Sequence, residues 1–206
     1  TITTSNPVRA RFYEYPRFTY PWHFHNEYEI IYVEEGEGDC LVGDSIISYS
    51  KGDLILFGSE LPHSMQSPPD DGEESDNGEK SKLKVKGVNI QFEKDFMHYS
   101  ISQYSQFIPI RNLLEDACRG IKFTVVHSGK IIKLLKQIPS ARGAEQIILL
   151  LSLLQMMATN NHRKYLTTSH YTPSPSIMRN ERMEKVIAYL NKHYTESIGL
   201  DEIASY

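Results

Sequence analysis

The stretch His23-Phe24-His25-Asn26-Glu27-Tyr28-Glu29 contains the most informative spacing of residues in the chain, and Gly36 follows it seven positions further on. Two histidines at positions i and i+2 of a strand project from the same face. Glu29 follows on the same segment, and His63 comes later, after Gly52-Asp53. Histidines together with a carboxylate are suitable ligands for Fe, Mn, Ni or Zn. We therefore treat four residues as candidates for one polar site: His23, His25, Glu29 and His63.

Segments typical of β-strands surround this stretch. They cover residues 11–15, 27–34, 39–42, 46–49, 54–57 and 85–92, and turn signals such as Gly43-Asp44-Ser45 separate several of them. Short strands at this spacing, separated by glycine-containing turns, favour an antiparallel barrel or sandwich over βαβ units. We expect residues 1–100 to form a β-barrel.

One acidic stretch interrupts these strands. Residues 68–82 contain six Asp or Glu residues and no apolar residue after Pro69. Such a segment cannot bury enough surface to become ordered, so we expect a mobile loop between two strands. A solvated insertion is the favoured interpretation, and binding to a basic partner is the alternative.

The sequence period changes to that of helices after about residue 105. Ile131, Leu134, Leu135 and Ile138 fall on one helical face, and Pro139 ends that helix. Residues 145–159 form a second helix that is apolar nearly all round, so two partners must bury it. A second copy of the chain could cover one side, with contacts through Leu150, Leu151 and Leu154; full burial within one chain is the alternative. The expected fold class is α+β, with residues 101–166 as a helical dimerisation segment.

The C-terminal part reads as a linker followed by helices. Residues 167–179 are rich in Ser, Thr and Pro, as is typical of a linker. Residues 180–206 contain a helical stripe from Met183 to Leu190 and then a second helix start at Leu200. The sequence stops within that second helix, so we expect it to be a piece of a longer protein.

The residues of the barrel resemble the two sequence motifs of the cupin superfamily. His23, His25, Glu29 and Gly36 match the first motif at every position. The second motif extends from Gly52 to His63 but departs from the enzyme pattern, since Gly58 and Glu60 stand where a proline and a glycine are typical.

The remaining sequence resembles AraC-type transcriptional regulators. Residues 87–96, residues 119–121 and the leucine-rich helix are similar to the sensor half of that family, and residues 181–204 to the opening of its helix-turn-helix DNA-binding domain. The resemblance implies that the barrel binds a small effector, with a sugar as one candidate, and that the chain forms a homodimer. It also implies DNA binding through the full-length protein, whose recognition helices lie outside this sequence, with no enzyme activity and no cofactor.

Three uses of the histidines and Glu29 remain open: lining an effector pocket, binding a metal, and structural hydrogen bonding. Tyr13 and Tyr32 could stack on a ligand or belong to the core. The predicted ligand-binding set is His23, His25, Glu29, His63, Tyr13 and Tyr32. The rival interpretation is a metal-dependent cupin enzyme, an isomerase or a dioxygenase, with the three histidines and Glu29 as metal ligands.

Composition narrows the class of protein further. The 206 residues include 22 Lys and Arg against 26 Asp and Glu, a net charge of −4, which argues against wrapping nucleic acid by bulk charge. The most apolar run, residues 147–158, is well short of the ~20 residues that span a bilayer. Residues 1–30 show no secretory signal pattern, and Cys40 and Cys118 could form at most one disulfide. We therefore expect two reduced thiols and a cytoplasmic protein.

Overall fold

The computed structural model describes residues 2–3, 6–68, 84–125, 127–172, 181–193 and 198–204. Nearly all of the predicted acidic loop (68–82) and most of the predicted linker (167–179) lie outside these residues. The described part is an α+β structure with two antiparallel sheets, which confirms the expected fold class.

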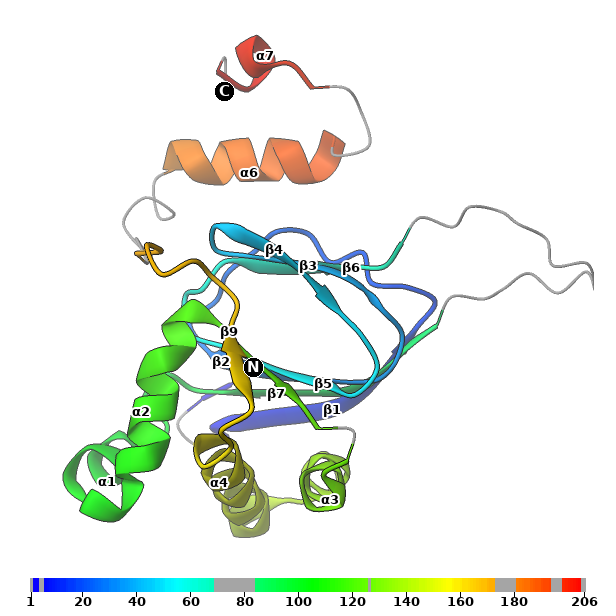
Figure 1. Cartoon of the computed structure of the whole chain (residues 1–206). Coiled ribbons are helices and arrows are strands. Elements are labelled where there is room, and N and C mark those ends of the chain that lie inside the picture. Colours follow the sequence, from blue (N-terminus) through cyan, green and yellow to red (C-terminus); the bar gives the residue numbers. More distant parts are fainter. Residues whose placement is uncertain are drawn as a thin grey trace, which may run out of the picture.

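The two sheets face each other as the two walls of the cupin-like barrel (Figure 1). The larger sheet has the strand order β1-β7-β2-β5-β8-β9, and the smaller one has the order β4-β3-β6. The strands are β1 (Val8–Tyr15), β2 (Tyr28–Glu35), β3 (Gly38–Val42), β4 (Ser45–Tyr49), β5 (Asp53–Phe57), β6 (His63–Gln66), β7 (Val85–Phe92), β8 (Ile121–Thr124) and β9 (Arg163–Tyr165).

Strand β2 shows how the larger sheet separates two cores. Alternate side chains of a strand point to opposite faces, so Ile30 and Tyr32 pack toward the helices, while Ile31 and Val33 pack between the sheets. Both faces of β2 are thus covered in its middle, which explains why residues 30–33 form an unbroken apolar run rather than an alternating pattern.

Helices cover the outer face of the larger sheet (Figure 1). Ile110, Leu113 and Leu135 from two of these helices join the sheet residues in one buried cluster. The helical elements before the linker are α1 (His98–Gln103), the 3-10 turn η1 (Ser105–Phe107), α2 (Ile108–Asp116), the 3-10 turn η2 (Ala117–Arg119), α3 (Gly129–Gln137) and α4 (Gly143–Ala158).

The larger sheet also contains strands that come after residue 100, the predicted end of the barrel. Strands β8 and β9 lie in the segment predicted to be helical, and they extend the larger sheet beyond β5. Each is only three or four residues long, too short to give a clear alternating pattern. The barrel and the helical segment therefore share one sheet.

Helix α4 buries within its own chain some of the residues that were predicted to contact a second copy. Leu150 and Leu154 are fully buried against α2, α3 and the larger sheet, and Leu151 is half-buried. Leu150 and Leu154 are consequently not available to a second copy, which corrects their assignment as dimer contacts. The outward face carries Ile148, which is 61% exposed.

The predicted C-terminal helices are present as α6 (Glu181–His193) and α7 (Leu200–Ala204). The Tyr189 hydroxyl donates a hydrogen bond to the Glu202 carboxylate and so links the two helices. None of the described helices has the length and apolar character needed to cross a bilayer.

Candidate functional site

The site is built where the segment before β2 meets the start of β6. His23 and His63 form an isolated antiparallel bridge, in which each backbone N–H donates to the other's carbonyl at 3.1 and 2.9 Å. The His25 carbonyl accepts from the N–H of Glu60 at 2.7 Å. These bonds hold the first histidine pair against the second motif, although forty residues separate them in sequence.

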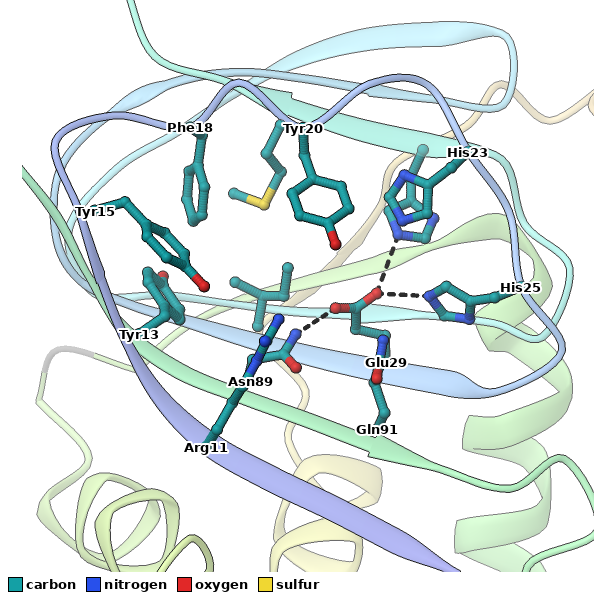
Figure 2. Close-up of a pocket in the computed structure, with 13 residues that line it drawn as sticks. Arg11, Tyr13, Tyr15, Phe18, Tyr20, His23, His25, Glu29, Asn89 and Gln91 are labelled. Atoms are coloured by element: carbon teal, nitrogen blue, oxygen red, sulfur yellow. Dashed lines mark hydrogen bonds and ion pairs between the residues drawn. The ribbon is translucent and has the colours of Figure 1, made fainter. Parts of the chain in front are cut away.

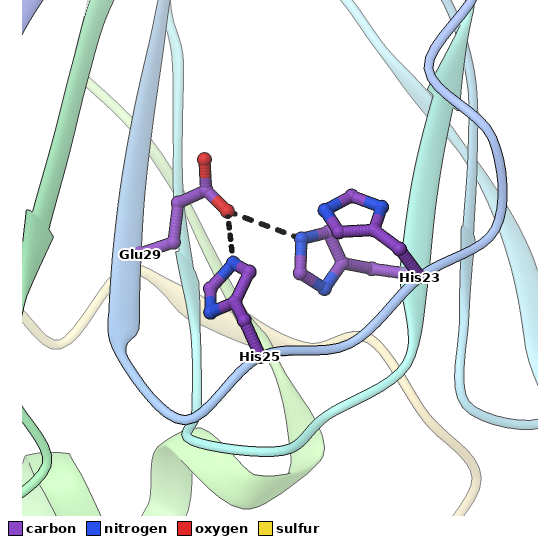
Figure 3. Close-up of side chains that lie close together, drawn as sticks. His23, His25 and Glu29 are labelled. Carbon is purple, nitrogen blue, oxygen red and sulfur yellow. Dashed lines mark hydrogen bonds and ion pairs between the residues drawn. The ribbon is translucent and has the colours of Figure 1, made fainter. Parts of the chain in front are cut away.

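The four predicted residues converge on one point between the sheets (Figure 3). The Nε2 atoms of His25 and His63 lie within hydrogen-bond distance of Glu29 Oε2, at 2.8 and 3.2 Å. The ligand atoms of His23, His25, Glu29 and His63 all lie within 4.8 Å of one another. Glu29 and His63 are buried, and His23 and His25 are partly exposed.

Backbone carbonyls fix the orientation of all three imidazoles. The Nδ1 atoms of His23, His25 and His63 lie 2.9, 3.0 and 2.7 Å from the carbonyls of Pro21, Glu27 and Leu61. Because a carbonyl only accepts hydrogen bonds, each Nδ1 carries a proton. In a neutral imidazole Nε2 is then unprotonated, and it donates to Glu29 only when the ring is doubly protonated. This is also the arrangement that orients histidine ligands of metals.

Charge in the cluster is arranged around Glu29. Burial raises the pKa of Glu29, but hydrogen bonds from His25 and His63 outweigh burial and hold that pKa well below its ordinary value. Burial lowers the pKa of His25, yet its hydrogen bond to Glu29 leaves that pKa raised overall. Burial and the neighbouring His63 lower the pKa of His23. The carboxylate is therefore ionised at neutral pH, and His25 carries a proton more readily than His23.

A cavity extends from this cluster between the two sheets (Figure 2). It encloses about 660 Å³ of empty space, including the part that opens to solvent. One wall is aromatic and apolar, and the floor carries polar side chains from β1 and β7. Besides the four clustered residues, the lining consists of Arg11, Tyr13, Tyr15, Phe18, Tyr20, Ile31, Met65, Asn89 and Gln91.

The two tyrosines predicted to contact a ligand have different positions. Tyr13 lines the cavity, whereas Tyr32 packs among the residues between the sheet and the helices. Tyr32 lies an odd number of residues from Glu29 on β2, so the two side chains point to opposite faces. The Tyr13 hydroxyl donates to the Tyr32 carbonyl at 3.0 Å, passing over Gly87, where a Cβ atom would leave it no room. The inclusion of Tyr32 in the ligand-binding set is corrected accordingly.

Arg11, Asn89 and Gln91 are the charged or amide lining residues that the sequence analysis missed. Arg11 shares the strand parity of Tyr13 and Tyr15, and Asn89 and Gln91 lie at alternate positions of β7. Both features are visible in the sequence. Only the pairing of β1 with β7 places Arg11 and Asn89 directly opposite each other.

The donor set at the cluster fits a divalent transition-metal ion. Three inward-facing Nε2 atoms, each with its Nδ1 fixed by a carbonyl, and one ionised carboxylate are a typical ligand combination for Zn, Fe or Mn. His23, His25, Glu29 and His63 are the residues that would hold such an ion. The same four groups can equally present hydrogen-bond donors and a carboxylate acceptor to an organic ligand.

Comparison with known proteins identifies the N-terminal part of the chain. Residues 6–75 match the family model of the AraC-like ligand binding domain. This segment is similar to an AraC-like ligand-binding domain. It contains β1 to β6 and most of the residues that line the cavity, including all four residues of the cluster. No curated protein matches the chain in sequence.

Similar solved structures include wild-type ToxT from Vibrio cholerae with a bound unsaturated fatty acid. It is 14% identical with a TM-score of 0.49, and the match covers 100% of this chain and 69% of that one. A salicylate 1,2-dioxygenase from Pseudaminobacter salicylatoxidans is 20% identical with a TM-score of 0.33, over 47% of this chain and 24% of that one. The DMSP lyase DddQ from Ruegeria pomeroyi is 19% identical with a TM-score of 0.32, over 42% of this chain and 38% of that one. All three similarities are too distant to assign a ligand or a reaction.

Proposed function

We propose that the chain is the effector-sensing and dimerisation part of a DNA-binding transcription regulator of the AraC type. The observation that carries this proposal is the cavity, whose polar and aromatic lining comes mainly from the AraC-like ligand-binding segment. The effector is a small molecule bound between the two sheets, and the domain is not an enzyme. Two free thiols, Cys40 and Cys118, support a cytoplasmic location.

In this proposal, α6 and α7 are the start of the DNA-binding domain. The segment that leads toward them is attached to the barrel close to the cavity. His63 pairs with Val42 across strands β6 and β3, and the Pro62 carbonyl accepts from the N–H of Gly43 at 2.9 Å. The adjacent Asp44 accepts a hydrogen bond from the N–H of Thr168 at 3.0 Å and another from its hydroxyl. A ligand that favours one position of His63 would thus bias the attachment of the linker.

The first test of the proposal is ligand binding. A panel of small metabolites is screened by thermal shift, since a ligand that binds only the folded state must raise the melting temperature. His25→Leu is compared with Ile46→Leu, a change at an exposed position on β4 outside the cavity. We expect stabilising ligands to lose their effect in His25→Leu alone.

The second test is regulation by the same ligand. Its effect on operator affinity is measured by fluorescence anisotropy with the longer protein that contains complete recognition helices. A ligand that binds the barrel and leaves DNA affinity unchanged contradicts the sensor function.

Dimerisation is the second part of the proposal. Ile148 is exposed, and Leu151 and Ser152 beside it on α4 are half-buried. We propose that this face, rather than Leu150 and Leu154, contacts a second copy of the chain.

A metal-dependent cupin enzyme, an isomerase or a dioxygenase, is the second candidate function. The three carbonyl-fixed histidines around Glu29 are the observation that favours it. A bound metal would act as a Lewis acid toward a substrate in the cavity. Elemental analysis of protein purified without chelator or metal-affinity tag tests this candidate. Near-stoichiometric Fe, Mn, Ni or Zn that is lost in His25→Ala would support it, whereas traces of metal equal in both proteins would contradict it.

A further inference from the structure

The floor of the cavity contains a cationic side chain for which the described residues provide no hydrogen-bond or ion-pair partner. Arg11 projects from β1 into the cavity (Figure 2). Its Nε atom is buried without a hydrogen-bond partner, and none of the ion pairs among the described residues includes Arg11. The nearby carboxylate of Glu29 is already used by His25, His63 and Asn89. A guanidinium that is half-buried and unpaired loses hydration without compensation.

An unpaired hydrogen-bond acceptor lies beside this cation. Asn89 is the direct cross-strand partner of Arg11, with the register Arg11↔Asn89 between β1 and β7. Side chains in such pairs have Cβ atoms ~5 Å apart and point to the same face. The amide nitrogen of Asn89 donates to Glu29, which leaves Oδ1 buried without a partner. Buried polar atoms of this kind are normally satisfied, so the pair requires an explanation.

The Arg11 guanidinium and Asn89 Oδ1 could both be satisfied by one ligand that carries an anionic group and a hydrogen-bond donor. The guanidinium of Arg11 requires an anion, and carboxylates match its planar fork of donors. Asn89 Oδ1 requires a hydrogen-bond donor next to that anion, such as a hydroxyl. Tyr15, Phe18 and Tyr20 supply an aromatic wall for the carbon skeleton.

We infer that the effector is a small hydroxylated carboxylate, with its carboxylate on Arg11 and a neighbouring hydroxyl on Asn89. This inference rests on the proposed function and narrows the class of effector. Neutral sugars lack the anion for Arg11, and simple fatty acids lack the hydroxyl donor for Asn89. Sugar acids and other hydroxy acids contain both groups.

The test uses three fragments that differ by one group each: glycolate, acetate and glycolamide. Each is titrated into the ¹⁵N-labelled chain while the Arg11 Nε–H resonance is followed by NMR. Glycolate should bind roughly tenfold or more tightly than glycolamide, because a charge-assisted hydrogen bond is lost in the amide. Acetate should bind about fivefold more weakly than glycolate, because it lacks the hydroxyl.

Arg11→Gln is the diagnostic variant, and Arg9→Gln is its matched control. Arg9 lies two residues earlier on the same strand, is exposed, and does not line the cavity. Binding to the variants is followed through the backbone amide resonance of Asn89, which lines the same cavity. Glycolate and glycolamide should bind equally to Arg11→Gln, whereas Arg9→Gln should behave like the wild type. Both variants should keep the wild-type NMR spectrum elsewhere, which verifies the fold.

Two outcomes would overturn the inference. One is equal binding of glycolate and glycolamide to the wild type. The other is no shift of the Arg11 resonance at ~100 mM glycolate, far above the millimolar range of weak fragment binding. The sensor function itself would still be supported if a neutral compound altered DNA affinity and raised the melting temperature of the wild type but not of His25→Leu. Only the proposed class of effector would then be rejected.

Discussion

At the scale of single residues, the cluster depends on the sharing of one carboxylate oxygen by two imidazoles. The Nε2 atoms of His25 and His63 both lie within hydrogen-bond distance of Glu29 Oε2. The bond from His25 to Glu29 also links the protonation of the two groups.

Replacing Glu29 with Gln should lower the pKa of His25, because the hydrogen bond to Glu29 is what raises that pKa above the ordinary value of about 6.5. A raised folded-state pKa stabilises the protein fully below the unfolded-state pKa, and the contribution is lost as pH rises through the folded-state pKa. Stability of the wild type should therefore fall across this range more than that of Glu29→Gln. NMR titration of His25 and urea unfolding at several pH values measure both effects.

Glu27→Gln is the control for this prediction. Glu27 also lies near His25, with 3.6 Å between Nδ1 and Oε2, but it contributes less than Glu29 to the raised pKa. Its replacement should shift the pKa of His25 only slightly. An equal shift in both variants would show that general negative charge, rather than the hydrogen bond, controls His25.

Glu60, in the second motif, has a backbone conformation that is strained for any residue other than glycine. Its φ is +60°, a conformation that favours glycine, and glycine is the residue typical of cupins at this position. Glu60→Gly should be more stable than Glu60→Ala by about 1 kcal/mol, since both remove the side chain and only glycine relieves the strain. Urea unfolding of the two variants measures the difference. Equal stabilities would mean that the backbone relaxes without cost.

Residue spacing was enough to predict the cluster but not the whole cavity. His23, His25 and Glu29 lie close together in sequence, and the motif pattern adds His63. Whether Arg11 and Asn89 line the same cavity depends on which strands become neighbours. These two residues are paired across β1 and β7 although more than seventy positions separate them in sequence. Tyr32 was misassigned because its face depends on the phase of β2, which a strand apolar on both faces does not reveal.

At the scale of elements, the attachment of the linker to the β3–β4 turn is a small contact with a measurable effect. The N–H of Thr168 donates to Asp44, and the hydroxyl does the same. Asp44→Ala should speed hydrogen exchange of the Thr168 amide about fivefold, because one neutral-strength hydrogen bond is lost at an exposed site. Exchange followed by NMR gives the rate directly.

Asp44→Asn separates the hydrogen bond from general destabilisation. Asparagine keeps a side-chain oxygen that can accept from Thr168, so the exchange rate should stay near that of the wild type. Unchanged exchange in Asp44→Ala would indicate that β9 and Leu166, which is buried between the sheets, hold the linker without Asp44.

Element prediction succeeded for strands and helices with a strong period and failed for β8 and β9. The strand at residues 85–92 and the helices near residues 131–138 and 145–159 agree with β7, α3 and α4 within a few residues. Strands β8 and β9 are added to the sheet through pairing with β5 and with each other. Their assignment depends on tertiary contacts rather than on local sequence.

At the scale of the whole molecule, α4 determines how much apolar surface is left for a second copy. The sequence indicated that α4 needs partners on both sides. The structure supplies a large part of them within one chain, because α2, α3 and the larger sheet enclose Leu150, Leu153, Leu154 and Met157. A mutation in α4 therefore tests either folding or dimerisation, depending on the face that it alters.

Leu150→Ala should destabilise the fold by about 2–5 kcal/mol, because it leaves a cavity at a fully buried position. It should not change the oligomeric state of the folded fraction. Urea unfolding measures the loss of stability. A loss near zero would contradict the placement of Leu150 in the core.

Ile148→Glu should convert the dimer to a monomer in sedimentation velocity, with little change in urea stability, because Ile148 is 61% exposed in the single chain. The matched control is Ile46→Glu, which places the same charge at a position on β4 that is 70% exposed. This control should remain dimeric if the interface is the outward face of α4. Dimers that persist in Ile148→Glu would exclude that face. Monomers in the control alone would instead place the interface on the smaller sheet.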